Sequence, residues 1–173
     1  MPVWPFSTSR EMKDADLLLQ RVTGASRNPA LFGEGRAPDT LDGRFELITL
    51  YAGLALKRLR RSPEAEPLAQ AFVDALFKQL DAGLREEGVG DLAVPKRVHK
   101  LAGVFYARLE AYSPALDAHD VEALKETLKR NLMGTTSRFA ETLAIRVCDL
   151  AAAQTALPWQ ALMTAEGWPA FGS

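Results

Sequence analysis

The stretch LAQAFVDALFKQLDAGL, residues 68–84, decides the fold class of this chain. A leucine or phenylalanine stands at every fourth position of the stretch. This spacing places large side chains on one face of an α-helix, whereas a half-buried strand would alternate every second residue. We therefore expect an amphipathic helix over about residues 64–87, ended by Gly88 and Gly90. The repeated residues are Leu68, Phe72, Leu76, Leu80 and Leu84.

The same helical spacing recurs along the rest of the chain and predicts an all-α protein. Ser113 and Pro114 are expected to end a helix, because proline disrupts a helix interior. We expect one compact all-α domain of about six or seven helices over residues 10–166, with tails at residues 1–9 and 167–173. The other helices are expected at about residues 9–24, 40–61, 94–112, 121–133 and from 137 onward.

Length and composition fit a single globular domain with a substantial core. The chain has 173 residues, of which 47% are hydrophobic and 25% charged, a balance that argues against disorder. Its formal net charge is −1, so no overall positive field draws it to DNA, RNA or lipid, and such contacts need a local patch. The side chains expected to be buried together are Phe45, Ile48, Phe72, Leu76, Leu80, Leu101 and Phe105.

Features of targeting and catalysis are scarce. The first residues lack the basic and apolar regions of a secretory signal, and the longest uncharged stretch, residues 47–56, has about half the length of a membrane span. Cys148 is the single cysteine, and His99 and His119 are the only histidines. No residues stand at the spacing of a zinc site or a catalytic nucleophile. We expect a soluble cytoplasmic protein without catalytic activity, metal or cofactor.

Two segments carry an unusual density of charge at helix starts. The first, PDTLDGRFELI, spans residues 38–48. Asp39 or Thr40 is the expected helix cap, and Asp42 favours the positive end of the helix dipole. Gly43 lies inside the first turn, where it costs about 0.5–1 kcal/mol relative to alanine. We expect close approach of another backbone to explain this glycine, with a structural cause favoured over a bound partner.

The second segment, GVGDLAVPKRVHK, spans residues 88–100 and places bases at a helix start. Lys96, Arg97 and Lys100 oppose the helix dipole there, each at a cost of about 0.3–1 kcal/mol. Two interpretations stay open: nearby acids neutralise the bases, or the bases form a positive patch for an acidic or phosphate-bearing partner. The acids close in sequence are Glu86, Glu87 and Asp91.

These segments, with FYAR at residues 105–108, resemble a known family, and the similarity runs over about residues 10–131. The matching residues are Pro38, Asp39, Thr40, Asp42, Gly43, Arg44 and Phe45, then Asp81, Arg85, Gly88, Gly90, Asp91, Val94, Lys96, Arg97 and Lys100, then Phe105, Tyr106, Arg108 and Tyr112. The family is that of the ubiquinol–cytochrome c chaperones. The resemblance implies a bacterial, non-catalytic assembly factor of the respiratory cytochrome bc1 complex (complex III) that binds newly made cytochrome b.

The resemblance and the charge pattern together give a set of expected partner-binding residues. The set is Asp39, Asp42, Arg44, Phe45, Asp81, Arg85, Asp91, Lys96, Arg97 and Lys100. Besides cytochrome b, the ribosome and the cytoplasmic face of the inner membrane are possible binding partners, whereas binding to DNA is not expected. Two alternatives remain: an RNA- or ribosome-binding module that uses the bases of residues 57–61 and 96–100, and a helical protein that binds a small molecule.

Overall fold

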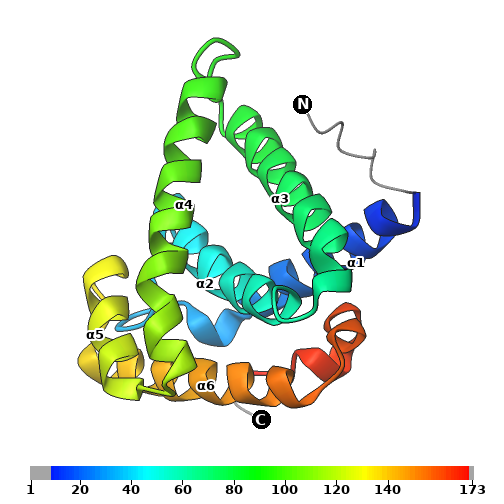
Figure 1. The fold of residues 1–173 in the computed structure, drawn as a ribbon. Coiled ribbons are helices and arrows are strands. Elements are labelled where there is room, and N and C mark those ends of the chain that lie inside the picture. The colour runs from blue at the N-terminus through cyan, green and yellow to red at the C-terminus, as the bar shows by residue number, and fades with distance from the viewer. Residues whose placement is uncertain (1–8, 172–173) are drawn as a thin grey trace.

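A computed structural model of the chain describes residues 9–171. Within this range the protein is all-α, as the apolar spacing predicts, and short 3₁₀ turns join several of the helices (Figure 1). The six α-helices of the described residues are α1 (Ser9–Ser26), α2 (Leu41–Leu59), α3 (Glu66–Glu86), α4 (Val94–Asp117), α5 (Val121–Asn131) and α6 (Ser137–Ala156). The expected N-terminal tail, residues 1–9, lies outside the described residues except for Ser9, the first residue of α1.

Helix α2 is the central element of the fold. Figure 1 shows α3 and α4 meeting at a loop and diverging below it, with α2 between their lower parts and α6 across the base. Because α2 is covered on several sides, its side chains are buried almost all round, including Leu47, Leu50 and Leu54. A broad apolar stripe of this kind is what a helix between neighbours requires.

The predicted shared core is largely confirmed. Five of its seven residues are buried in one cluster, and Leu80 and Leu101 are partly buried against that cluster. The five buried residues are Phe45, Ile48, Phe72, Leu76 and Phe105. Met12, which has the helical spacing of the α1 core face, is instead 58% exposed. The core therefore joins α2, α3 and α4 around side chains that the four-residue spacing identifies.

The expected end of α4 at Ser113 is wrong. The helix continues through Pro114 to Asp117, although proline removes one backbone hydrogen bond from its interior. Ala115 and Leu116 follow the proline and are both buried, at 6% and 7% exposure. We attribute the continuation to this burial, because it stabilises the last turn where local propensity opposes a helix.

Gly167 and Trp168, expected in a C-terminal tail, instead pack against the core. Trp168 is 9% exposed, its ring centroid lies 6.3 Å from that of Tyr51, and its indole Nε1 donates to the Leu162 carbonyl at 2.8 Å. Gln154 Nε2 donates to the Gly167 carbonyl at 2.9 Å. Ordered structure thus extends past the boundary that the turn residues suggested.

Candidate functional site

A cleft of about 650 Å³ lies between the start of α2, the first half of α4 and the end of α5. We call it the α2–α4 cleft. Its apolar walls come from all three regions, and charged side chains stand among them. The apolar lining includes Phe45, Leu101, Val104, Leu132 and Met133, and the charged lining is Asp42, Glu46, Arg97, Lys100 and Arg108. The two charge-dense sequence segments, far apart in the chain, therefore meet at one surface.

A second hollow of about 240 Å³ adjoins the first on the side of α3, and we call it the α3-side hollow. Asp42, Phe45, Arg97 and Leu101 line both hollows. Phe45 is 8% exposed, so its ring serves as a shared wall of the two hollows and offers little accessible surface. The first turn of α2 thus separates two adjoining depressions that share the same acid, aromatic ring and base.

Local backbone geometry fixes the start of α2 at the edge of the cleft. Thr40 is the N-cap, and its Oγ1 accepts a hydrogen bond from the Gly43 amide at 3.1 Å. A Cβ on Gly43 would lie 2.0 Å from the Pro38 carbonyl oxygen, a distance that no side chain tolerates. The expected close backbone approach is therefore made by the chain's own preceding loop, which gives this glycine a structural cause.

An ion pair crosses the interior side of the α2–α4 cleft. Arg108 donates from Nε to Glu46 Oε2 at 2.9 Å and from Nη2 to Oε1 at 2.9 Å. Glu46 is 9% exposed, and the Arg108 side chain is 28% exposed. The hydrogen bonds that Arg108 donates to Glu46 raise the pKa of Arg108, against the opposing effect of burial. This two-point contact ties α2 to α4 beneath the cleft.

Sequence reasoning did not single out Glu46. The sequence does contain a clue to its role. Glu46 is a single carboxylate between Phe45 and Leu47, in a helix that is apolar on most of its faces. A carboxylate in such a place needs a buried partner. The partner, Arg108, belongs to the residues that carry the family resemblance, but no local pattern pairs it with a residue 62 positions away.

Other expected binding residues lie outside the cleft. Arg85 binds both Asp81 and Asp91 at the outer end of α3, with the Nε–Asp81 distance at 3.0 Å. On the exposed start of α2, Arg44 Nε lies 2.8 Å from Asp39 Oδ1, and Arg44 also lines the α3-side hollow. Of the ten expected residues, five line the two hollows. These are Asp42, Arg44, Phe45, Arg97 and Lys100.

The bases at the start of α4 are not neutralised by ion pairs within residues 9–171. Lys96, Arg97 and Lys100 have no acidic partner within 4.0 Å there, and Asp91, expected to serve one of them, is held by Arg85. Arg97 lines both hollows, Lys100 lines the α2–α4 cleft, and Lys96 is exposed and lines neither. The arrangement favours the interpretation of these bases as a positive patch.

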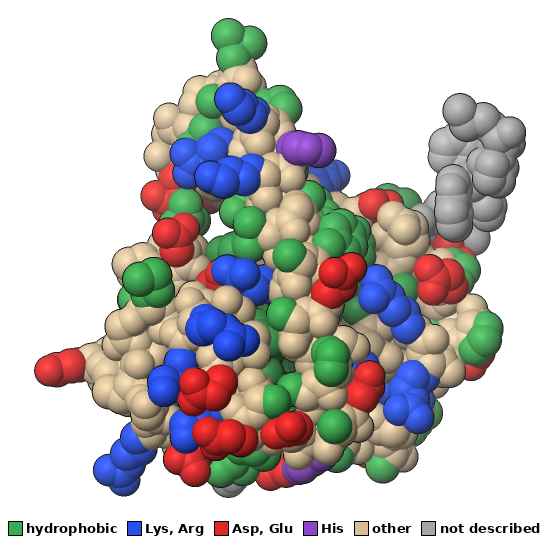
Figure 2. All heavy atoms as spheres, turned by 60° about the vertical axis from the view of Figure 1, so that its left-hand side comes forward, with side chains coloured by type: hydrophobic (Ala, Val, Ile, Leu, Met, Phe, Trp, Pro, Cys, Tyr) green, Lys and Arg blue, Asp and Glu red, His purple; other side chains and the backbone are tan. Residues whose placement is uncertain are grey.

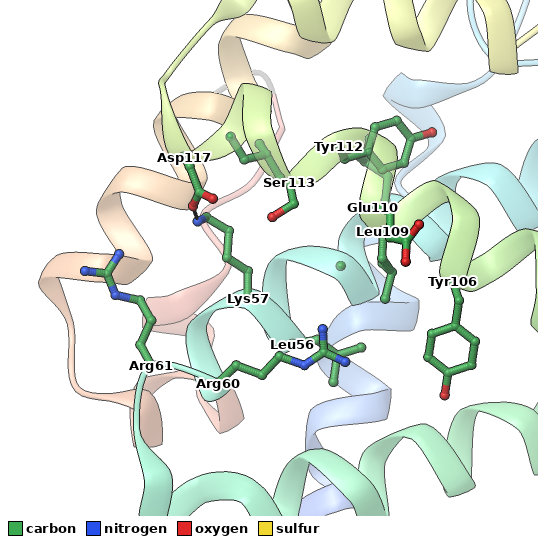
Figure 3. Close-up of a pocket in the computed structure, with 13 residues that line it drawn as sticks. Leu56, Lys57, Arg60, Arg61, Tyr106, Leu109, Glu110, Tyr112, Ser113 and Asp117 are labelled. Atoms are coloured by element: carbon green, nitrogen blue, oxygen red, sulfur yellow. Dashed lines mark hydrogen bonds and ion pairs between the residues drawn. The ribbon is translucent and has the colours of Figure 1, made fainter.

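Two of the four cations in the second basic cluster, residues 57–61, make structural contacts. A groove of about 540 Å³ runs between the end of α2 and α4. In Figure 3, Lys57 of α2 and Arg60, which follows α2, lie on the side opposite Tyr106, Glu110 and Asp117 of α4. Lys57 pairs with Asp117 across this groove. Burial, with a smaller contribution from the Arg61 charge, lowers the pKa of Lys57.

Arg58 of the same cluster is also engaged. It donates to the backbone carbonyls of Gln154 and Leu157 at 2.8–3.1 Å. Arg60 and Arg61 stay exposed, so this cluster offers two cations to nucleic acid where the sequence suggests four.

The described residues show no constellation that suggests metal chemistry. Within residues 9–171 no three His, Cys, Asp or Glu side chains gather as metal ligands do. Cys148 is fully buried, and burial, with the nearby charges of Asp149 and Asp120, raises its pKa. A raised pKa lowers the thiolate fraction, as is usual for a structural cysteine. None of the helices in this range combines the length and apolar character needed to cross a bilayer.

Comparisons with known proteins identify the family. Residues 34–166 match the family model described as ubiquinol-cytochrome C chaperone. The structure is similar to the crystal structure of the Cbp3 homolog from Brucella abortus, with a TM-score of 0.77 and 34% sequence identity over 95% of this chain and 93% of that one. A search of curated proteins gave no match. The matched region includes α2 to α6 and every residue of the α2–α4 cleft, and the chain belongs to the ubiquinol–cytochrome c chaperone family.

Proposed function

We propose that this protein is a non-catalytic chaperone that binds newly made cytochrome b and assists assembly of the cytochrome bc1 complex, and that the α2–α4 cleft holds the client. The observation that carries the proposal is the convergence of both charge-dense segments on one cleft with apolar walls. Family membership supports the assembly role. The site of action in this proposal is the cytoplasm, beside the membrane that receives cytochrome b.

The chemistry of the cleft suits a segment of an unassembled membrane protein. Such a segment presents apolar side chains that must be shielded from water until they are inserted, and an apolar groove can shield them. Leu101, Val104 and Leu132 supply that surface. Arg97 and Lys100 stand among these residues without acidic partners in the described part of the chain. They are free to bind a carboxylate or a helix C-terminus of the client.

Met133 gives the cleft an adaptable edge. Its side chain is 80% exposed just past the end of α5, although it is large and apolar. Methionine is flexible and polarizable, and exposed methionines suit surfaces that accept several apolar shapes. A chaperone that holds a client before its final packing benefits from such a surface, whereas a catalytic pocket needs fixed polar groups.

Deleting the gene should lower the amount of assembled cytochrome bc1 complex. Cytochrome b protein should fall while its messenger RNA stays unchanged. The reason is that loss of the chaperone leads to degradation of the unshielded protein and does not affect transcription of its gene. Blue native electrophoresis and ubiquinol–cytochrome c reductase assays measure the assembled complex and its activity, and immunoblotting and quantitative PCR measure cytochrome b and its messenger RNA. A control strain that re-expresses the wild-type chain should recover both. Normal reductase activity in the deletion strain would contradict the proposal.

Replacing Lys96, Arg97 and Lys100 together with glutamine should weaken capture of cytochrome b without destabilising the fold. The thermal midpoint should be unchanged or slightly raised, because three cations are removed from the positive end of the α4 dipole. The difference in capture should shrink as salt rises, since salt screens exposed charges. A matched control replaces Lys13, Lys78 and Arg138, which are exposed and form no ion pair within residues 9–171. A destabilised triple variant that captures cytochrome b normally would refute the functional role of these bases.

A further inference from the structure

The loop between α3 and α4, residues 87–93, projects at one end of the fold (Figure 1). Leu92 lies in this loop with 99% of its surface exposed, the highest value among the large hydrophobic side chains of residues 9–171. A leucine that is fully in water contributes nothing to the core. Its position at the projecting end therefore calls for an explanation other than folding.

The loop has a defined shape that keeps Leu92 outward. Gly88 adopts a positive φ of 86°, which reverses the chain after α3. Arg85 holds Asp91 on the other side of the turn, and Val94, two residues after Leu92, is fully buried. Residues on both sides of Leu92 are thus fixed by contacts, so its exposure is a property of the folded hairpin.

Cations stand directly behind the apolar tip. Figure 2 shows hydrophobic side chains at the projecting end and Lys and Arg side chains gathered just behind them. Lys96 and Lys100 are exposed and have no acidic partner within 4.0 Å in residues 9–171. From the tip inward, the hairpin presents an apolar side chain first and cations second. A bilayer with anionic lipids has its apolar acyl chains inside and its negative headgroups at the surface, so an inserted tip would place the leucine among apolar groups and the cations beside negative ones.

The acids near the tip are directed elsewhere. Asp91 is bound by Arg85, and Glu86 and Glu87 line the α3-side hollow. Asp39 raises the pKa of Arg44, and the charge of Glu87 adds a smaller contribution in the same direction. Arg44 lines the same hollow as Glu87. The two glutamates thus lie with Arg44 and Arg97 at the α3-side hollow, which neither Lys96 nor Lys100 lines.

We propose that the tip of the α3–α4 hairpin docks on an anionic phospholipid surface. Leu92 enters the boundary between headgroups and acyl chains, and Lys96 and Lys100 lie at the level of the lipid phosphates. RNA is a poorer fit, because a leucine ahead of the bases offers neither a stacking ring nor a phosphate contact. Docking in this way holds the mouth of the α2–α4 cleft near the bilayer.

Vesicle co-sedimentation of the full chain tests the proposal. The wild-type protein should bind vesicles of phosphatidylcholine with 30% phosphatidylglycerol, and should not bind pure phosphatidylcholine. Leu92→Asp should weaken binding about tenfold, as expected for loss of one buried leucine. Lys96→Gln should weaken it about fivefold, as expected for one cation at an anionic membrane surface. Leu92 neither lines the α2–α4 cleft nor belongs to the three bases replaced in the capture experiment, so cytochrome b capture by Leu92→Asp tests the client site separately.

Matched controls come from exposed residues away from the tip. Met12→Asp on α1, at a side chain that is 58% exposed, and Lys78→Gln on α3 should bind the anionic vesicles as the wild type does. Wild-type protein that fails to bind anionic vesicles would overturn the proposal, as would unchanged binding by Leu92→Asp. Tight binding of a 20-nucleotide single-stranded RNA that depends on Lys96 and not on Leu92 would assign the patch to nucleic acid instead.

Discussion

Replacing Glu46 with alanine should lower the free energy of unfolding by about 3 kcal/mol. The change leaves the Arg108 guanidinium partly buried without the carboxylate that it contacts at two points, 2.9 Å each. The Arg108 side chain is 28% exposed, so some solvation offsets the loss, and we expect the lower end of the range for broken buried pairs. Denaturant unfolding followed by circular dichroism measures the effect.

Glu110→Ala is the matched control, since Glu110 is an exposed acid on α4. Its change should stay within about 0.5 kcal/mol, the usual range for surface substitutions. The double variant Glu46→Ala/Arg108→Ala should lose less than the two single losses added together, because the two residues interact directly. Additive single losses, or a Glu46→Ala loss as small as that of the control, would show that the pair does not hold α2 to α4.

Replacing Phe105 with alanine should cost about 3–5 kcal/mol of folding free energy. Phe105 is fully buried, and its ring meets Phe77 of α3 edge-on at a centroid distance of 5.4 Å. The cavity left behind would loosen the contact between α3 and α4. Thermal and denaturant unfolding measure the loss.

The neighbouring Tyr106→Ala provides the comparison for Phe105→Ala. Tyr106 is 44% exposed, and its ring also packs on Phe105, at 5.3 Å. We expect its replacement to cost less than half as much, because less surface is withdrawn from water. Equal costs for the two variants would mean that Phe105 is not the residue that joins the helices. The comparison also distinguishes the two neighbouring aromatic residues. Phe105 is expected to stabilise the core, whereas Tyr106 is expected to act at the surface.

The fold class was predictable because side-chain periodicity is a local signal. The four-residue spacing of Leu68, Phe72 and Leu76 is enough to predict α3, and all three side chains are buried. The error at Pro114 has a tertiary cause, since burial of the following turn overrides a local helix breaker. The packing of Trp168 depends on Tyr51, more than 100 residues earlier, and no local pattern carries that information.

The candidate site was predictable only in part. The two charge-dense segments were identifiable as unusual, and the structure brings Asp42 and Phe45 from the first beside Arg97 and Lys100 from the second. The contributions of Leu132 and Met133 could not be foreseen, because they come from the end of α5, whose place depends on the whole topology. Charge patterns thus indicated the rim of the cleft, whereas its apolar walls required the three-dimensional arrangement.

Site-specific photo-crosslinking in cells tests most directly whether the α2–α4 cleft holds the client. A benzophenone amino acid at position 133 replaces a cleft side chain that is 80% exposed, and the same amino acid at position 145 replaces the exposed Ile145 of α6 as a control. We predict a crosslinked product with newly made cytochrome b from position 133 and none from position 145. Equal products from both positions, or none from position 133 in cells that assemble the bc1 complex normally, would contradict it.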